Sequence, residues 1–195
     1  MIIKDMYIHP LLILDDDESK LKSEIILKRK RIKLLTYNIF LRPPPVKNNE
    51  SDWKNERLID FLQEIENYDI ICLQEAFESF NTRINELVRI ANKAGFFFFC
   101  SSPIPSFFSK YSVDGGLLIL SRFPILSHEF VPFDYGVLSD ALAYKGYLMA
   151  HLKIAESNIV IINTHTQASY FQSSEEHWVK IVINILKNLY IESKL

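Results

Sequence analysis

Apolar residues recur with two different periods along this chain, and each change of period marks an expected element. Short apolar runs or strict alternation are typical of strands, whereas apolar positions three and four residues apart are typical of helices. The pattern predicts strands over 32–40, 69–76, 96–100, 116–121, 128–133, 145–154 and 158–165. It predicts helices over 53–68, capped by Ser51 or Asp52, over 81–94, and from Ser174 onward. Strands combined with outer helices indicate an α/β layered sandwich.

The two ends of the chain depart from this pattern. Residues 1–30 mix short apolar stretches with charged runs, so we expect an N-terminal extension followed by a domain over 31–195. The last predicted helix has no strand after it, which leaves few strands for a second sheet. We therefore expect the domain to be truncated at its C-terminus.

Composition narrows the class of protein. The chain has 195 residues, of which 48% are apolar and 24% charged, an ordinary balance for one globular domain. Its net charge of −2 provides no overall basic field, so nucleic acid is not the favoured partner. Cys72 and Cys100 lie in apolar runs without a zinc-site spacing, so we expect two buried free thiols.

Targeting signals are not evident in the sequence. No segment has the pattern of a signal peptide, and no apolar run reaches the roughly 20 residues of a membrane span. We expect a cytoplasmic or peripheral membrane protein, and the sequence does not indicate its oligomeric state.

Three polar residues, Asn38, Glu75 and His165, stand at the ends of predicted apolar strands. A buried strand delivers such a side chain rigidly to the rim of a sheet. Glu75 could bind Mg²⁺, which often takes one or two carboxylates besides water, or it could be a capping or ion-paired residue. Asn38 could orient a metal-bound water or cap a turn, and His165 could contact a phosphate, act as acid or base, or be a hydrogen-bonded rim residue.

Four ordered motifs give these residues a common context: TYNIF, LQEA, DGGLLILSRFPI and NTHTQA. In this order and at these distances they resemble the endonuclease/exonuclease/phosphatase superfamily, from about Ile32 to Tyr170. The resemblance implies a DNase-I-like fold, a four-layered α/β sandwich of two packed sheets with outer helices. The segments YNIFLRPPP, SPIPSFFSK, DALAYKG and NTHTQASY further resemble the neutral sphingomyelinase branch.

The resemblance implies a Mg²⁺-dependent phosphodiesterase that converts sphingomyelin at a membrane surface to ceramide and phosphocholine. Glu75 and Asn38 would lie in the metal shell, and His165, Asn38, Asp140 and Lys145 would serve catalysis. The resemblance implies that Asp140 and Lys145 help set an active loop, and Lys145 would suit a phosphate as a point charge. Asp140 and Lys145 could instead form an exposed ion pair, or Lys145 could simply be the first residue of a strand.

Two other functions remain alternatives. In nucleases of the same superfamily the glutamate motif usually continues with Thr and Lys, whereas Ala76 and Phe77 follow here. The aromatic segment with Phe107, Phe108 and Tyr111 suits a membrane surface better than a phosphate backbone, unless these rings are simply core. A non-catalytic binding module is the second alternative.

The sequence departs from the superfamily after His165. An Asp-x-Asn motif and a terminal Asp-His pair, which support the nucleophile and supply the general base, do not follow it. The resemblance therefore implies an incomplete active site, and we expect no measurable phosphodiesterase activity from this chain alone. A missing base would have to be sought among Asp114, Asp140 and His151.

Overall fold

The computed structural model describes residues 31–44, 53–133 and 142–166, and in this part of the chain every predicted strand is present. The strands are β1 (Leu34–Leu41), β2 (Ile70–Ala76), β3 (Phe98–Ser101), β4 (Leu118–Ser121), β5 (Ile125–Pro132), β6 (Gly146–Ile154) and β7 (Ser157–Thr164). The helices are α2 (Lys54–Glu64), which continues into the 3-10 turn η1 (Ile65–Asn67), and α3 (Arg83–Lys93). Ser51, Asp52, the extension over 1–30 and the helix from Ser174 lie outside the described residues.

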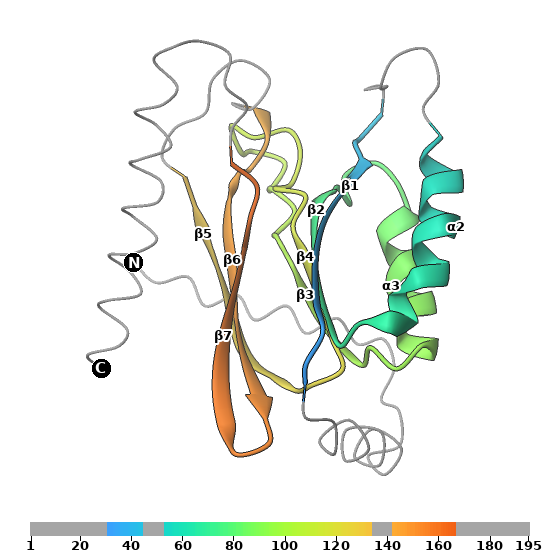
Figure 1. The fold of residues 1–195 in the computed structure, drawn as a ribbon. Coiled ribbons are helices and arrows are strands. Elements are labelled where there is room, and N and C mark those ends of the chain that lie inside the picture. Colours follow the sequence, from blue (N-terminus) through green and yellow to red (C-terminus); the bar gives the residue numbers. More distant parts are fainter. Residues whose placement is uncertain (1–30, 45–52, 134–141, 167–195) are drawn as a thin grey trace, which may run out of the picture.

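The first sheet has the strand order β1-β2-β4-β3. β1 and β2 run parallel, with Asn38 opposite Gln74, while β4 is antiparallel to both β2 and β3. All seven residues of β2 are buried, as expected for a continuous apolar strand covered on both faces. Because β1 and β2 are parallel, their carboxyl ends meet at one edge, which lies at the top of Figure 1.

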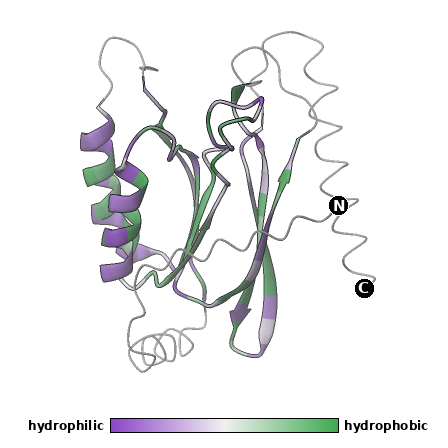
Figure 2. Ribbon diagram, turned by 180° about the vertical axis from the view of Figure 1, so that it is seen from behind, coloured by the Kyte–Doolittle hydropathy of each residue, from purple (hydrophilic) through white to green (hydrophobic). Residues whose placement is uncertain are grey.

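The second sheet has the order β5-β6-β7 with antiparallel pairing throughout, and it packs face to face with the first (Figure 1). A core that includes Ile119, Phe123 and Leu148 fills the space between the sheets. The two helices cover the opposite face of the first sheet through a second core around Leu73, Leu87 and Phe96. Figure 2 shows the helices hydrophobic toward the sheet and hydrophilic toward solvent. Two packed sheets with outer helices confirm the predicted α/β sandwich.

Close backbone approaches explain the paired glycines of the DGG motif. A Cβ at Gly115 would lie 2.5 Å from the carbonyl oxygen of Tyr144, so a side chain does not fit. Gly116 has φ +65°, a conformation that other residues adopt at a cost, and its carbonyl accepts the backbone N–H of Ala76 at 2.9 Å. The motif therefore joins the loop before β4 to the end of β2.

The two cysteines confirm the expectation from their apolar runs. Cys72 and Cys100 are buried free thiols, and burial raises the pKa of each to about 12. They are therefore protonated members of the core rather than reactive groups. Among the described residues, no helix is both long and apolar enough to span a bilayer.

Candidate active site

Parallel strands bring Asn38 and Glu75 to the same edge of the first sheet. Register pairs Asn38 of β1 with Gln74 of β2, and it shifts through an irregularity between Asn38 and Leu41. Two residues at these strand ends, Phe40 and Glu75, have φ of 54° and 53°, in the left-handed region that is uncommon for their residue types. Such backbone strain persists where the surrounding structure fixes it, and it concentrates at functional sites.

The Glu75 carboxylate is buried and surrounded by side chains from separate segments. Its Oε1 accepts a hydrogen bond from the Asn38 amide at 2.9 Å and lies 3.4 Å from Nε2 of His165. Its Oε2 accepts a hydrogen bond from Nε of Arg42 at 2.6 Å, which forms an ion pair. The Glu75 side chain is 9% exposed, whereas Arg42 and His165 are 37% and 29% exposed and link the site to solvent.

These contacts set the charge of Glu75. Burial by itself would raise the pKa of this carboxyl group, but hydrogen bonds from His165, Arg42 and Asn38 outweigh burial and lower the pKa to about 2. Stabilisation of the charged form by donors is the opposite of the effect of desolvation. At neutral pH the carboxylate is therefore ionised, as a metal ligand must be.

A buried amide pair joins the two sheets directly behind this carboxylate. Nε2 of Gln74 donates to Oδ1 of Asn163 at 2.7 Å. The Asn163 amide in turn donates to the carbonyl oxygens of Leu73 at 2.8 Å and Leu118 at 3.1 Å. Asn163 in β7 is thus bonded to three residues of the first sheet. His165, two residues further along, consequently reaches Glu75 across the gap between the sheets.

Asn38 presents its amide nitrogen, not its oxygen, to the site. Its Oδ1 accepts the backbone N–H of Phe40 at 3.1 Å while its Nδ2 donates to Glu75. In this arrangement Asn38 orients the carboxylate. A direct bond from Asn38 to a metal stays a prediction, since it requires the amide to turn.

The segment containing Asp140 and Lys145 is only partly described. Asp140 lies outside the described residues. Lys145 precedes β6, and its carbonyl accepts the backbone N–H of Phe133 at 2.9 Å. Tyr147 pairs with Thr164, so Lys145, just before β6, lies near the point where β7 leads into His165. The register places Lys145 at the same edge as the other residues, and its contact with phosphate stays a prediction.

Asp114 has a structural role. Its Oδ2 accepts the backbone N–H groups of Glu78 at 3.0 Å and Ser79 at 2.8 Å, together with the Ser79 hydroxyl at 2.6 Å. Its Oδ1 accepts the backbone N–H of Gly116 at 2.7 Å. With 1% exposure and both oxygens bonded within the protein, Asp114 fixes the loop after β2 and is not placed to act as a general base.

The side chains around Glu75 suit a hard cation only if water and substrate oxygens supply most of its ligands. The described residues contain no group of three or more His, Cys, Asp or Glu side chains that could hold a metal ion. Mg²⁺ nevertheless binds commonly through one or two carboxylates, with waters and phosphate oxygens completing its shell. An ionised, solvent-linked Glu75 meets that requirement.

Sequence reasoning did not assign roles to Arg42, Gln74 and Asn163. Gln74 and Asn163 carried a usable signal, because a polar residue inside a buried apolar strand needs a partner and two such residues can satisfy each other. Arg42 follows the last residue of β1 and precedes three prolines, which is a common place for a solvated side chain. Its contact with Glu75 could not be deduced from spacing.

Comparison with known proteins places this arrangement in a family. The profile described as the Endonuclease/Exonuclease/phosphatase family matches residues 35–184. A sphingomyelinase of Dictyostelium discoideum is 27% identical, in an alignment that covers 75% of this chain and 53% of that protein.

Solved structures agree on the fold. The crystal structure of SmcL has a TM-score of 0.67 and 21% identity, covering 83% of this chain and 58% of that one. A beta toxin from Staphylococcus aureus with bound magnesium ions has a TM-score of 0.59 and 25% identity, covering 71% and 50%. The chain spans about half the length of the curated relatives it matches.

Proposed function

Because the chain belongs to the Endonuclease/Exonuclease/phosphatase family, we propose that it provides the metal-binding edge of a Mg²⁺-dependent phosphodiesterase that acts on sphingomyelin. The observation that carries the proposal is the surroundings of the buried, ionised Glu75 carboxylate. Asn38 in the first sheet and His165 at the end of β7 in the second sheet both contact it. Sphingomyelinase relatives support the substrate, and a neighbour with bound magnesium supports the cation.

Each residue has a role that follows from its position. Glu75 would hold Mg²⁺, which when bound polarises a phosphoryl oxygen and stabilises developing negative charge. Asn38 keeps the carboxylate oriented through its 2.9 Å hydrogen bond. His165, partly exposed beside Glu75, would donate a hydrogen bond to a non-bridging phosphate oxygen, and Lys145 would neutralise phosphate charge from its position just before β6. Asp140 would set the loop that precedes Lys145.

The metal site can be tested in this chain by calorimetric titration with Mg²⁺. Substrate and turnover can be tested with sphingomyelin vesicles in millimolar Mg²⁺, by measuring phosphocholine release. Because the relatives are about twice as long, the assay compares the chain alone with a fusion to the C-terminal half of a sphingomyelinase relative. In the active fusion, His165→Ala should lower kcat by about 10²-fold with a smaller effect on KM.

Other results would assign other functions. Cleavage of abasic DNA by the fusion, without release of phosphocholine, would identify a nuclease. A melting temperature that Mg²⁺ does not raise would indicate a non-catalytic binding module, because a cation that binds the native state must stabilise it.

A further inference from the structure

The two most exposed large hydrophobic side chains in the described part of the chain are neighbours at the tip of one loop. Phe107 and Phe108 are 96% and 95% exposed, in the segment that joins β3 to β4. Single exposed apolar residues are ordinary on protein surfaces. Two adjacent phenylalanines almost entirely in water are a different case, because apolar surface of this kind marks an interaction site.

The loop is built to hold these rings away from the core. The backbone N–H of Ser109 donates to the carbonyl of Ser106 at 2.9 Å, which closes a turn whose two central residues are the phenylalanines. Central turn positions usually carry Gly, Pro, Asn, Asp or Ser. The two rings meet edge to face at 5.5 Å. Behind the turn, Tyr111 stacks on Tyr144 at 4.7 Å and anchors the base of the loop.

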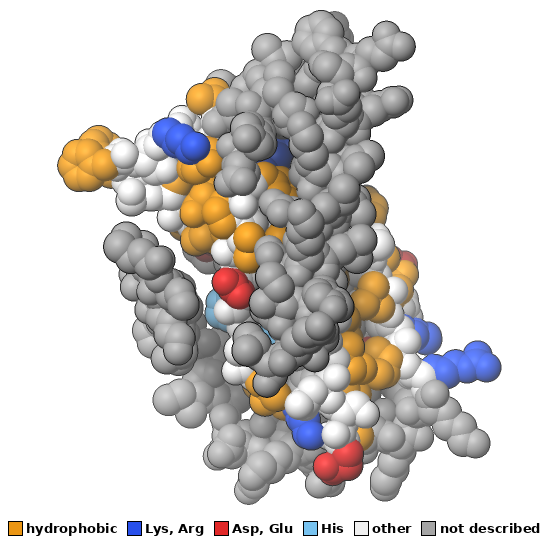
Figure 3. Space-filling model, turned by 90° about the vertical axis from the view of Figure 1, so that its left-hand side faces the viewer, with side chains coloured by type: hydrophobic (Ala, Val, Ile, Leu, Met, Phe, Trp, Pro, Cys, Tyr) orange, Lys and Arg blue, Asp and Glu red, His pale blue; other side chains and the backbone are white. Residues whose placement is uncertain are grey.

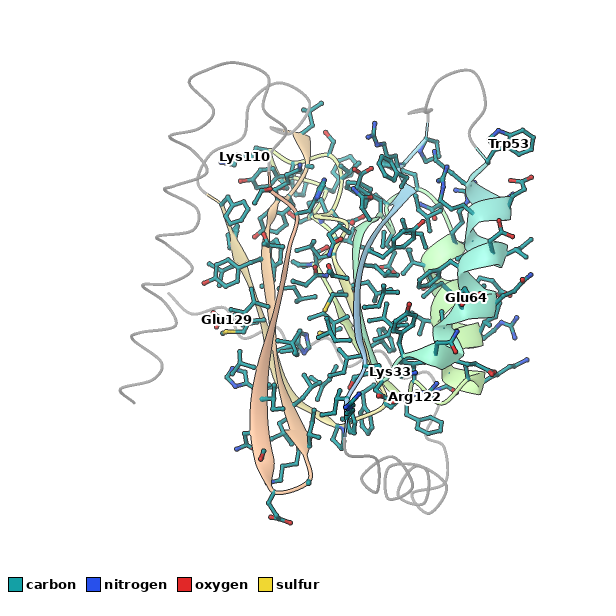
Figure 4. All side chains as sticks on the ribbon, viewed as in Figure 1. Lys33, Trp53, Glu64, Lys110, Arg122 and Glu129 are labelled. Carbon is teal, nitrogen blue, oxygen red and sulfur yellow. The ribbon has the colours of Figure 1, made fainter. Side chains whose placement is uncertain are left out.

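This tip projects from the same end of the molecule as Glu75. In the first sheet Leu118, at the start of β4, lies opposite Leu73 near the end of β2. The segment before β4 is also bonded to the end of β2, through Ala76 N–H and the carbonyl of Gly116. In Figure 4, Lys110, next to the tip, lies at the upper end of the molecule, whereas Lys33 lies near the lower end.

Other exposed aromatic residues share this end. Phe80, which is 75% exposed, lies in the loop after β2, and Trp53, which is 62% exposed, precedes α2 at the upper end of Figure 4. Figure 3 shows a hydrophobic group standing out from the upper part of the molecule with a basic side chain beside it. Aromatic rings accompanied by lysine, such as Lys110, are typical of segments that enter the membrane interface.

We infer that the Phe107–Phe108 tip inserts into the interface of a phosphocholine-lipid bilayer and holds the Glu75 edge against the lipid headgroups. The inference rests on the proposed function for its choice of lipid. Loops that project from separate elements to one end can all meet a flat, soft surface without a shaped partner. The chain has a net charge of −2, so burial of aromatic surface, rather than long-range attraction to anionic lipid, drives the contact.

The test is co-sedimentation of the chain with vesicles of sphingomyelin, phosphatidylcholine and cholesterol. The double variant Phe107→Ser/Phe108→Ser should partition at least about tenfold more weakly than the parent, because two rings no longer enter the interface. A matched double variant, Ile59→Ser/Leu126→Ser, removes two side chains that are each 58% exposed on α2 and β5, and it should bind like the parent. Raising salt from about 0.1 to about 0.5 M should change parent binding little.

Controls separate this inference from the proposed function. Each variant is checked for its melting temperature and for Mg²⁺ binding by calorimetry, and both should be unchanged in the Phe107→Ser/Phe108→Ser protein. Equal vesicle binding by parent and tip variant, or equal loss in the matched control, overturns the inference. The parent could instead form a dimer that the Phe107→Ser/Phe108→Ser substitutions dissociate, and fail to bind vesicles. That result would show that the tip contacts a second copy of the chain, and it would also overturn the inference. If the parent does not bind Mg²⁺, that result would count against the proposed function and not against the inference about the tip.

Discussion

Two buried carboxylates lie at the same edge of the first sheet, and their partners differ in kind. Asp114 accepts mainly backbone N–H groups, those of Glu78, Ser79 and Gly116, together with the Ser79 hydroxyl, and all of these belong to the loops that it joins. Glu75 is contacted by the side chains of Asn38, Arg42 and His165, of which the last two reach solvent.

The difference teaches how the same chemical group serves structure or function. Backbone donors cannot leave a carboxylate unless the loop unfolds, so Asp114 is fixed in its role. Side-chain donors can rotate away, so the cation of the proposed metal site could replace them at Glu75. The positive φ of 53° at Glu75 supports the proposed metal-binding role, because backbone strain concentrates at functional sites.

The largest expected effect is on the binding of Mg²⁺. Glu75→Gln should abolish binding in calorimetric titration, because an amide lacks the negative charge that a hard cation requires. The matched control is Glu86→Gln, which neutralises an exposed carboxylate paired with Arg89 on α3. Equal affinity in Glu75→Gln and the parent would remove Glu75 from the metal site.

For stability the comparison predicts that substitution of Asp114 has a larger effect than substitution of Glu75. Asp114→Ala should cost about 2 to 4 kcal/mol of unfolding free energy, because several buried donors lose their acceptor at once. Urea denaturation monitored by circular dichroism measures this cost. At neutral pH the Asp114→Ala variant should have a much lower unfolding free energy than the Glu75→Gln variant. A smaller cost for Asp114→Ala than for Glu75→Gln would contradict the assignment of roles.

The dependence of stability on pH provides an independent test of the contacts around Glu75. The folded pKa of Glu75 is lowered from its ordinary value of 4.5 to about 2. A lowered folded pKa contributes stability that is complete above the ordinary value and is lost as the pH falls toward 2. The difference in unfolding free energy between the parent and Glu75→Gln should therefore narrow between pH 5 and pH 2. A constant difference across this range would mean that the contacts of Glu75 do not favour its ionised form.

The sequence predicted the fold well because the fold depends on local patterns. The apolar run at 69–76 becomes a fully buried strand, and Gly95, with φ +93°, ends α3 where the sequence places a helix stop. The helix over 53–68 is confirmed as α2 and η1. Each of these outcomes depends on residues close together in the chain.

The candidate site was predictable only in part. Asn38, Glu75 and His165 were expected at strand ends, and the structure brings them together. The partners that hold them there lie far apart in sequence, as Gln74 and Asn163 do, and pairing between two sheets cannot be derived from either strand alone. The expectation of an incomplete active site stays a prediction, since it concerns segments outside the described residues.

The smallest expected effect concerns Arg42. Its guanidinium binds the Glu75 carboxylate oxygen that the proposed cation would contact. Nε of Arg42 lies 2.6 Å from Oε2 of Glu75, and Arg42 is 37% exposed. Breaking a partly exposed ion pair of this kind costs about 0.5 to 1 kcal/mol, so Arg42→Ala should raise the affinity for Mg²⁺ by about 2- to 5-fold. The hydrogen bond from Asn38 keeps the carboxylate oriented in the variant. Arg89→Ala is the matched control, because it breaks an exposed pair on α3 without touching the site. A weaker affinity for Mg²⁺ in Arg42→Ala would show that Arg42 positions Glu75 for the cation. Of the two solvent-exposed donors, only His165 would then be one that the cation can replace.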